Sequence, residues 1–242
     1  MNVDGLFAQL SYGELSNLAI GMEGSGEVLP AMQPSIITHT NHVLTDIYSQ
    51  MAHKRCYVNL ELVADQTVYR IHPMHAVTTV PLDNGIPRFI QDTVDEPFVQ
   101  EIIKIMDIEE AVDTNEDGKT NIHLNDVIDT ASIKTLSYDT ILVPDPVAGI
   151  VLVLECQVNH LALSTNPVDL TEEIELLPVM QAALVAKIAA RVYSTMNGEE
   201  NAIKAERLKA EYEAALRLVK QEDLAPDSSS AVTKKMHLGG WP

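Results

Sequence analysis

The sequence predicts an α+β fold in which N-terminal helices and a C-terminal helical hairpin flank a small antiparallel β domain. Apolar residues recur at helical spacing near both ends of the chain, whereas in the middle they alternate with polar residues as in strands. Turn residues separate these zones, and a polar, serine-rich segment follows the last helical pattern. We expect N-terminal helices over 1–55, an antiparallel β domain over 56–160, a helical hairpin over 161–223 and an extended C-terminal arm over 224–242.

The composition is that of an acidic globular protein. The 242 residues are 46% hydrophobic and carry a formal net charge of −19, with 35 acidic and 16 basic side chains. This balance argues against tight binding of nucleic acid, because contact with phosphates needs concentrated Lys and Arg. It suits a surface past which DNA slides without sticking, and it equally suits simple solubility. No apolar run approaches the about 20 residues that cross a bilayer, so no membrane partner is expected.

The N-terminal zone is predicted to hold a short helix and a longer one. Leu15 and Leu18 lie at helical spacing after Ser11, a residue type that caps helices well. The glycines at 21, 24 and 26 indicate a loop after this stretch. A longer amphipathic helix is predicted from Pro34 to about residue 52, because its apolar residues repeat every three or four positions.

The β domain is predicted as one small antiparallel sheet. Alternation over 56–62 and again over 67–71 predicts a β-hairpin with one wet face. Four prolines between residues 73 and 97 favour irregular or edge segments. Further strands are expected at 103–108, 132–142 and 150–158. Cys56 and Cys156 are interpreted as buried thiols in strands.

The C-terminal zone has the clearest helical pattern. Thr171 is expected to begin a helix that ends near Asn197-Gly198, and a second helix is predicted over about 199–223. The two helices would form an antiparallel hairpin.

The C-terminal arm concentrates positive charge and the chain's single tryptophan. Its notable residues are Lys234, Lys235, Met236, His237, Leu238 and Trp241. Tryptophan is costly to expose and is frequent at interface anchors. We therefore interpret the arm as a docking segment, and the alternative is a disordered end.

The segment from Asp113 to Gly118 matches the first half of an EF-hand loop. Asp113, Asn115 and Asp117 are candidate cation ligands, and the glycine would make the sharp turn. The position of the closing Glu holds Leu124, so the shell lacks its bidentate carboxylate. A polar hairpin turn and a weak cation site are both open interpretations.

Two histidine pairs are further candidate groups. His39 and His42 lie three residues apart on a predicted helix, where a polar helix face competes with a metal role that lacks a third ligand. His72 and His75 bracket a turn, where they form either a pH switch or a simple surface pair. The sequence contains no nucleophile-elbow or nucleotide-binding motif. We expect neither an enzyme nor a cofactor.

The residue order of the C-terminal half resembles a known family. It runs through Pro144-Asp145-Pro146, Cys156–His160, Val168-Asp169-Leu170, Glu173-Ile174, Leu176-Leu177-Pro178, Ala183-Leu184, Ala189-Ala190-Arg191, Tyr193 and Gly198-Glu199-Glu200-Asn201. This pattern is similar to that of the head-to-tail adaptor, or neck, proteins of short-tailed bacteriophages. The resemblance implies an elongated helical bundle, formed by N-terminal helices and a C-terminal hairpin, with a small β domain inserted and an extended arm.

The same resemblance implies a structural virion protein. A twelve-fold homo-oligomeric ring would join the portal protein to the tail nozzle or tail tubular protein, in the virion neck, after assembly in the host cytoplasm. The arm would dock on the portal, and Glu206, Glu211 and Glu213 would face a channel through which DNA passes. The alternative function, from another class, is a cation-dependent carbohydrate-binding or hydrolytic tail accessory protein, based on the 113–118 loop.

Overall fold

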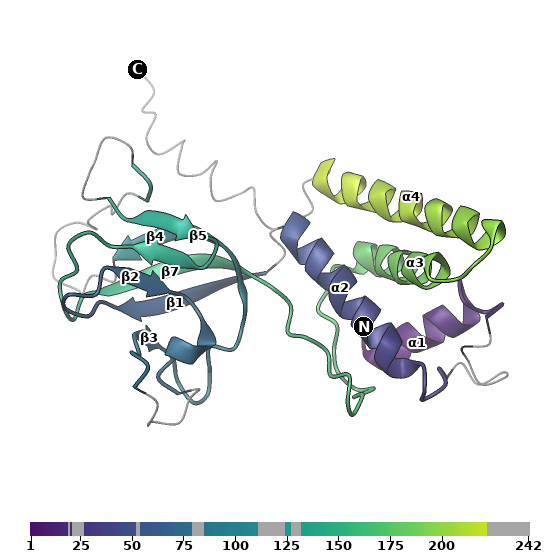
Figure 1. Cartoon of the computed structure of the whole chain (residues 1–242), viewed down its shortest axis with the longest axis horizontal. Coiled ribbons are helices and arrows are strands. Elements are labelled where there is room, and N and C mark those ends of the chain that lie inside the picture. Colours follow the sequence, from purple (N-terminus) through teal and green to yellow (C-terminus); the bar gives the residue numbers. More distant parts are fainter. Residues whose placement is uncertain are drawn as a thin grey trace, which may run out of the picture. The chain divides into compact units, whose positions relative to one another are not determined.

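A computed structural model describes residues 1–18, 20, 27–51, 54–78, 85–110, 124–126 and 132–221 (Figure 1). These residues form two compact units. One comprises the described residues of Met1–His53 and Ala162–Pro242, and the other those of Lys54–Leu161. The first contains helices and is here called the helical unit; the second contains strands and a single-turn 3₁₀ helix and is called the β unit.

The described part of the helical unit contains four helices, three of which surround the fourth. They are α1 (Val3–Tyr12), α2 (Gln33–Gln50), α3 (Pro178–Ser194) and α4 (Glu199–Gln221). Helices α1, α2 and α4 all pack on α3 (Figure 1). The buried residues of α3 lie on nearly every side of the helix, as expected for an element surrounded by others: Met180, Ala183, Leu184, Val185, Ala186, Ile188, Ala189, Ala190, Val192 and Tyr193.

Helix α1 begins earlier than the sequence pattern indicated. Asn2 caps it, because its Oδ1 accepts a hydrogen bond from the N–H of Gly5 at 2.9 Å. The packed face repeats every three or four residues and consists of Val3, Leu6, Phe7 and Leu10. The prediction of a helix starting at Ser11 is wrong: this residue lies next to the end of α1, and Leu15 is buried in the turns that follow.

The longer predicted helices are confirmed, with one corrected boundary. Helix α2 matches the expected span from residue 34, and α4 matches the expected second helix of the C-terminal zone. Helix α3 begins at Pro178 and not at Thr171. Proline suits the first turn of a helix but keeps the residue before it out of the helical conformation. The preceding segment instead pairs with the start of the chain, where the N–H of Ile174 donates to the carbonyl of Met1 at 2.7 Å.

The β unit contains two antiparallel sheets that share one hydrophobic core. Its strands are β1 (Arg55–Glu61), β2 (Val68–Arg70), β3 (Ile90–Gln91), β4 (Ile102–Glu110), β5 (Lys134–Ser137), β6 (Thr140–Leu142) and β7 (Val151–Val158), with η1 (Pro73–His75) before β3. The strand orders are β3-β1-β7-β4 and β2-β6-β5. Val58 and Leu154 of the larger sheet lie in the same buried cluster as Tyr69 and Ile141 of the smaller one. Each sheet therefore has one face on this core and one face that points away from it, and the two outward faces lie on opposite sides of the core.

Two strand predictions are wrong and the others are confirmed. The expected hairpin of 56–62 with 67–71 does not form, because β1 pairs with β7 and β3 while β2 pairs with β6 in the other sheet. The single strand expected over 132–142 is split at Tyr138 and Asp139 into β5 and β6. The strands expected at 103–108 and 150–158 are β4 and β7. The described residues of the proline-rich segment include η1 and the short strand β3 at a sheet edge.

The expected overall architecture is wrong. Instead of an elongated helical bundle with a small antiparallel β domain inserted, the described residues form an α+β structure with four helices of 10 to 23 residues and sheets of four and three strands. Pro178 shortens the C-terminal hairpin, and the residues between β7 and α3 are not helical. Apolar residues of β2 and β6 need a second sheet to cover them. The expected extended arm, 224–242, lies outside the described residues.

Asn41 fixes the non-helical segment before α3 to helix α2. Its Nδ2 donates to the carbonyl of Leu163 at 3.0 Å, and its Oδ1 accepts from the Leu163 N–H at 2.9 Å. One side chain thus satisfies both backbone groups of a buried residue 122 positions away.

We predict that Asn41→Ala lowers the free energy of unfolding by about 1–3 kcal/mol, because it leaves both backbone groups of Leu163 unpaired. Urea denaturation followed by circular dichroism measures the change. Thr38→Ala, on the exposed side of the same helix, is the matched control and should stay within about 0.5 kcal/mol of wild type. Equal stability of the two variants would contradict the assigned role of Asn41.

Candidate functional site

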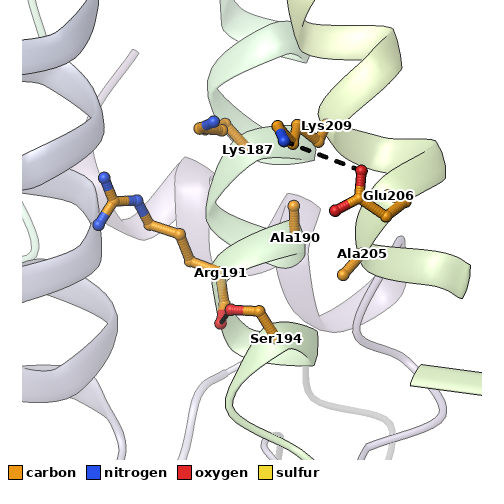
Figure 2. Close-up of a pocket in the computed structure, with 7 residues that line it drawn as sticks. All are labelled: Lys187, Ala190, Arg191, Ser194, Ala205, Glu206 and Lys209. Atoms are coloured by element: carbon orange, nitrogen blue, oxygen red, sulfur yellow. Dashed lines mark hydrogen bonds and ion pairs between the residues drawn. The ribbon is translucent and has the colours of Figure 1, made fainter. Parts of the chain in front are cut away.

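An open groove of about 230 Å³ lies between α3 and α4 (Figure 2). The side chains at its centre are small and so make room for the groove, and charged side chains surround it. The lining residues are Lys187, Ala190, Arg191 and Ser194 of α3, with Ala205, Glu206 and Lys209 of α4. Three cations and one carboxylate therefore border a groove in a chain that is acidic overall.

The charged groups of the groove do not converge on one point. Figure 2 shows that the Arg191 side chain extends away from the centre, and its Nη2 lies 3.1 Å from Oδ2 of Asp46 on α2. Lys209 Nζ lies 3.8 Å from Oε2 of Glu206, on the same helix. The Ser194 hydroxyl donates to the carbonyl of Arg191 at 2.7 Å. Within this groove the chemistry is that of partly paired surface charges, which suits a contact surface better than a reaction centre.

Two buried polar atoms lie close to the groove. Among the described residues, neither the hydroxyl of Tyr212 nor Nε of Arg191 has a hydrogen-bond partner. Burial, and next the neighbouring Asp46, raise the pKa of Tyr212 to about 12. The phenol therefore stays neutral at physiological pH. Lys187 Nζ lies 4.7 Å from the centre of the Tyr212 ring, which adds a cation–π contact between α3 and α4.

The three acidic residues expected to face a channel do not share one side of α4. All three are exposed. With about 100° per residue, Glu206 and Glu213 lie within about 20° of each other around the helix, whereas Glu211 lies about 140° from Glu206. Glu211 Oε1 is 3.5 Å from Nε of Arg207. Over its whole length α4 carries as many Lys and Arg as Glu residues, so its surface is balanced in charge.

The candidate histidines are engaged in local structure. His39 is half-buried, and burial first, then Arg191 and His42, lower its pKa, so it is neutral at pH 7. His72 Nδ1 accepts from the N–H of Met74 at 3.2 Å and caps η1. The His75 ring stacks on Phe89 at 4.5 Å between ring centres. Where residues are described, no group of three or more His, Cys, Asp and Glu side chains is placed to hold a metal ion.

Two predicted sites lie outside the described residues. These are the candidate cation ligands Asp113, Asn115 and Asp117, and the docking arm with Lys234, Lys235, Met236, His237, Leu238 and Trp241. Their assignments stay predictions, as does the alternative function that depended on the 113–118 loop.

Sequence analysis missed the cations of the groove, although the sequence carries a signal for them. Residues 1–53 contain no Lys or Arg. In the helical unit, the described Lys and Arg residues therefore all belong to α3 and α4. The pattern could have indicated that this helix pair bears the positive charge of the unit.

The two cysteines lie directly opposite each other on β1 and β7, a pairing that the sequence did not reveal. Both are free thiols, and Cys156 is fully buried. Burial is the main reason that the pKa of Cys56 rises to about 11, and it raises the pKa of Cys156 as well. Because the thiolate is the nucleophile, both groups are unreactive near neutral pH.

We predict that iodoacetamide modifies Cys56 in a Cys156→Ser variant about a hundred-fold more slowly in the native state at pH 8 than in urea. The unfolded thiol has an ordinary pKa near 8.5, whereas the native thiol is almost fully protonated at that pH. Between pH 7.5 and 9.5 the native rate should rise about tenfold per pH unit, since the thiolate fraction does so below the raised pKa. Mass spectrometry measures the rates, and equal native and unfolded rates at pH 8 would refute the prediction.

Comparisons with known proteins supply no family for the chain. No family model matches it, and no curated protein does. In the described part of the chain, each helix is too short or too polar to cross a membrane.

Proposed function

We propose that this protein is a structural virion protein, a head-to-tail adaptor that forms a ring below the portal of a short-tailed phage and lines the channel for DNA. The observation that carries the proposal is that α4 has two apolar sides. Its inner side packs on α3 through Ala205, Leu208, Tyr212, Leu216 and Val219. Its outer side exposes Ile203 and Leu218, which are 64% and 45% accessible, with Ala210 and Ala214 between them.

A helix that is apolar on opposite sides is suited to lie between two neighbours. The spacing of the outer residues, Ile203, Ala210, Ala214 and Leu218, keeps them within one stripe opposite the buried stripe. Arg207 lies on the same stripe, one turn after Ile203, and forms an ion pair with Glu211 at the edge of the stripe. A surface that combines exposed apolar side chains with an arginine is typical of contacts between proteins.

The arm adds a second means of contact. It follows α4 in the sequence and combines two lysines, a histidine and the single tryptophan. Trp and basic residues are frequent among the side chains that contribute most to binding between proteins. On the adaptor hypothesis, the arm docks on the portal protein and α4 faces a neighbouring virion protein.

The balanced charge of α4 refines the hypothesis about the channel. Glu206 and Glu213 can line one surface together, whereas Glu211 belongs to another side of the helix. Lys209 lies beside Glu206 and reduces its effect on passing phosphates. We infer that the negative wall of such a channel draws on acidic residues beyond α4.

We predict that deleting residues 231–242 leaves the free energy of unfolding within about 0.5 kcal/mol of wild type and abolishes stable binding to the portal protein of the same phage genome. The fold should persist, because the helices that surround α3 are intact. Size-exclusion chromatography with light scattering, and negative-stain images of the mixture, measure binding.

The matched control replaces Ser228, Ser229 and Ser230 with alanine, which changes the same region without removing its cations or tryptophan. This variant should bind as wild type does. If the truncated chain occupies portals as fully as the control, the docking role of the arm is wrong.

A further inference from the structure

The larger sheet of the β unit has an open face that is acidic. Val58 and Leu60 of β1 point into the core, so Tyr57 and Glu61 point outward. Register places the outward residues of three strands in rows, including Tyr57, Glu155 and Asp107 in one row and Asn59, Val153 and Glu109 in the next. Tyr57 is 71% exposed. Among the described residues of this face, Glu61, Glu155, Asp107 and Glu109 outnumber the cations Arg55 and Lys104.

The smaller sheet has an open face of the opposite character. Its outward rows are Val68, Leu142 and Lys134, and Arg70, Thr140 and Ser137. Leu136 and Tyr138, at the end of β5 and in the turn after it, are 55% and 60% exposed. Two cations and several large apolar side chains thus occupy this face. The carboxylate of Asp139, in the turn between β5 and β6, is 8% exposed and is already paired with Arg70.

Arg70 is held in place on this face. Its Nε donates to Oδ2 of Asp139 at 2.8 Å. The hydroxyls of Ser137 and Thr140 donate to the other carboxylate oxygen at 2.7 and 2.8 Å. Burial opposes ionisation of Asp139, but the three hydrogen bonds and the charge of Arg70 outweigh it and lower its pKa. A fixed guanidinium beside exposed Tyr and Leu loses little conformational freedom on binding, which favours affinity.

We propose that a second copy of this chain docks here, with the basic, apolar face of the smaller sheet in one copy lying on the acidic face of the larger sheet in the next. The charge complementarity identifies the occupant, because one unit carries both halves of the contact on opposite sides of one core. The contact is heterologous, so each copy that joins leaves one face of each kind free. Such a contact repeats into a ring or a filament. It adds a contact between subunits to the proposed function and does not depend on the arm.

Sedimentation velocity of the full chain, from micromolar to about 1 mM at low salt, tests the contact. Wild type should self-associate with a constant that weakens as salt is added. Lys134→Glu with Leu136→Ser reverses charge on one face and keeps the Arg70–Asp139 pair. Glu61→Lys with Glu109→Lys alters the other face. Each variant alone should associate at least tenfold more weakly, and an equimolar mixture of the two should recover wild-type association within about threefold.

Lys220→Glu, an exposed residue of the helical unit, is the matched control for the charge change and should associate as wild type does. Thermal unfolding and near-ultraviolet circular dichroism confirm that each variant is folded. If a face variant unfolds, a photo-crosslinking residue at position 138 replaces it and should join to β1, β4 or β7 of another copy. The chain lacking 231–242 should keep this self-association even though it fails to bind portal, which separates this inference from the proposed function.

Any of three association results would overturn the proposal. They are a wild-type chain that stays monomeric at 1 mM, a Lys134→Glu, Leu136→Ser variant that associates like Lys220→Glu, and a mixture that does not recover association. Crosslinks from position 138 that reach the helical unit alone would also overturn it.

Discussion

The helical unit depends on the burial of α3. Its buried residues lie all around the helix, so it is stable only when other elements cover every side. Burying a single large aliphatic side chain contributes about 1.5–3 kcal/mol, which makes this covering the main stabilising term of the unit. The cover comes from both ends of the chain, α1 and α2 on one hand and α4 on the other. Polar contacts then fix the arrangement of the helices. For example, the Tyr193 hydroxyl donates a hydrogen bond to the carbonyl of Glu14 at 2.8 Å.

Charge is distributed unevenly over the two units. Residues 54–161 hold 18 of the 35 acidic side chains but 7 of the 16 basic ones. In the helical unit the described cations lie on α3 and α4, where Arg191 pairs with Asp46 and Arg207 with Glu14. Net charge alone therefore describes neither unit, because the same chain presents basic and acidic surfaces. Within the β unit, register between strands decides which charges share a face.

Local patterns in the sequence predicted the elements that depend on local interactions. Helices α2 and α4 carry a clear helical period and were predicted, as were strands β4 and β7. Strand pairing was not, since β1 joins β7 about a hundred positions away and the sequence gives no local sign of it. The sequence pattern predicted a helix after Ser11 and missed α1, which Asn2 caps and whose first turn accommodates Gly5. The open faces, like the opposition of Cys56 and Cys156, follow from register and burial, which only the folded chain defines.

In the proposed assembly, weak contacts between sheet faces and a docking arm would act in complementary ways. Charged, partly solvated pairs contribute little each, so two faces of this kind hold copies together loosely in dilute solution. An arm that docks on a shared partner raises the effective concentration of neighbouring copies to the millimolar range, where a loose contact becomes populated. In the proposed assembly the affinities would set the order of events: copies would dock first and join their neighbours afterwards. A contact strong enough to form rings without the partner would close the rings before docking. The Arg70 side chain is fixed but exposed to solvent, which weakens its charge interactions and agrees with a weak contact between copies.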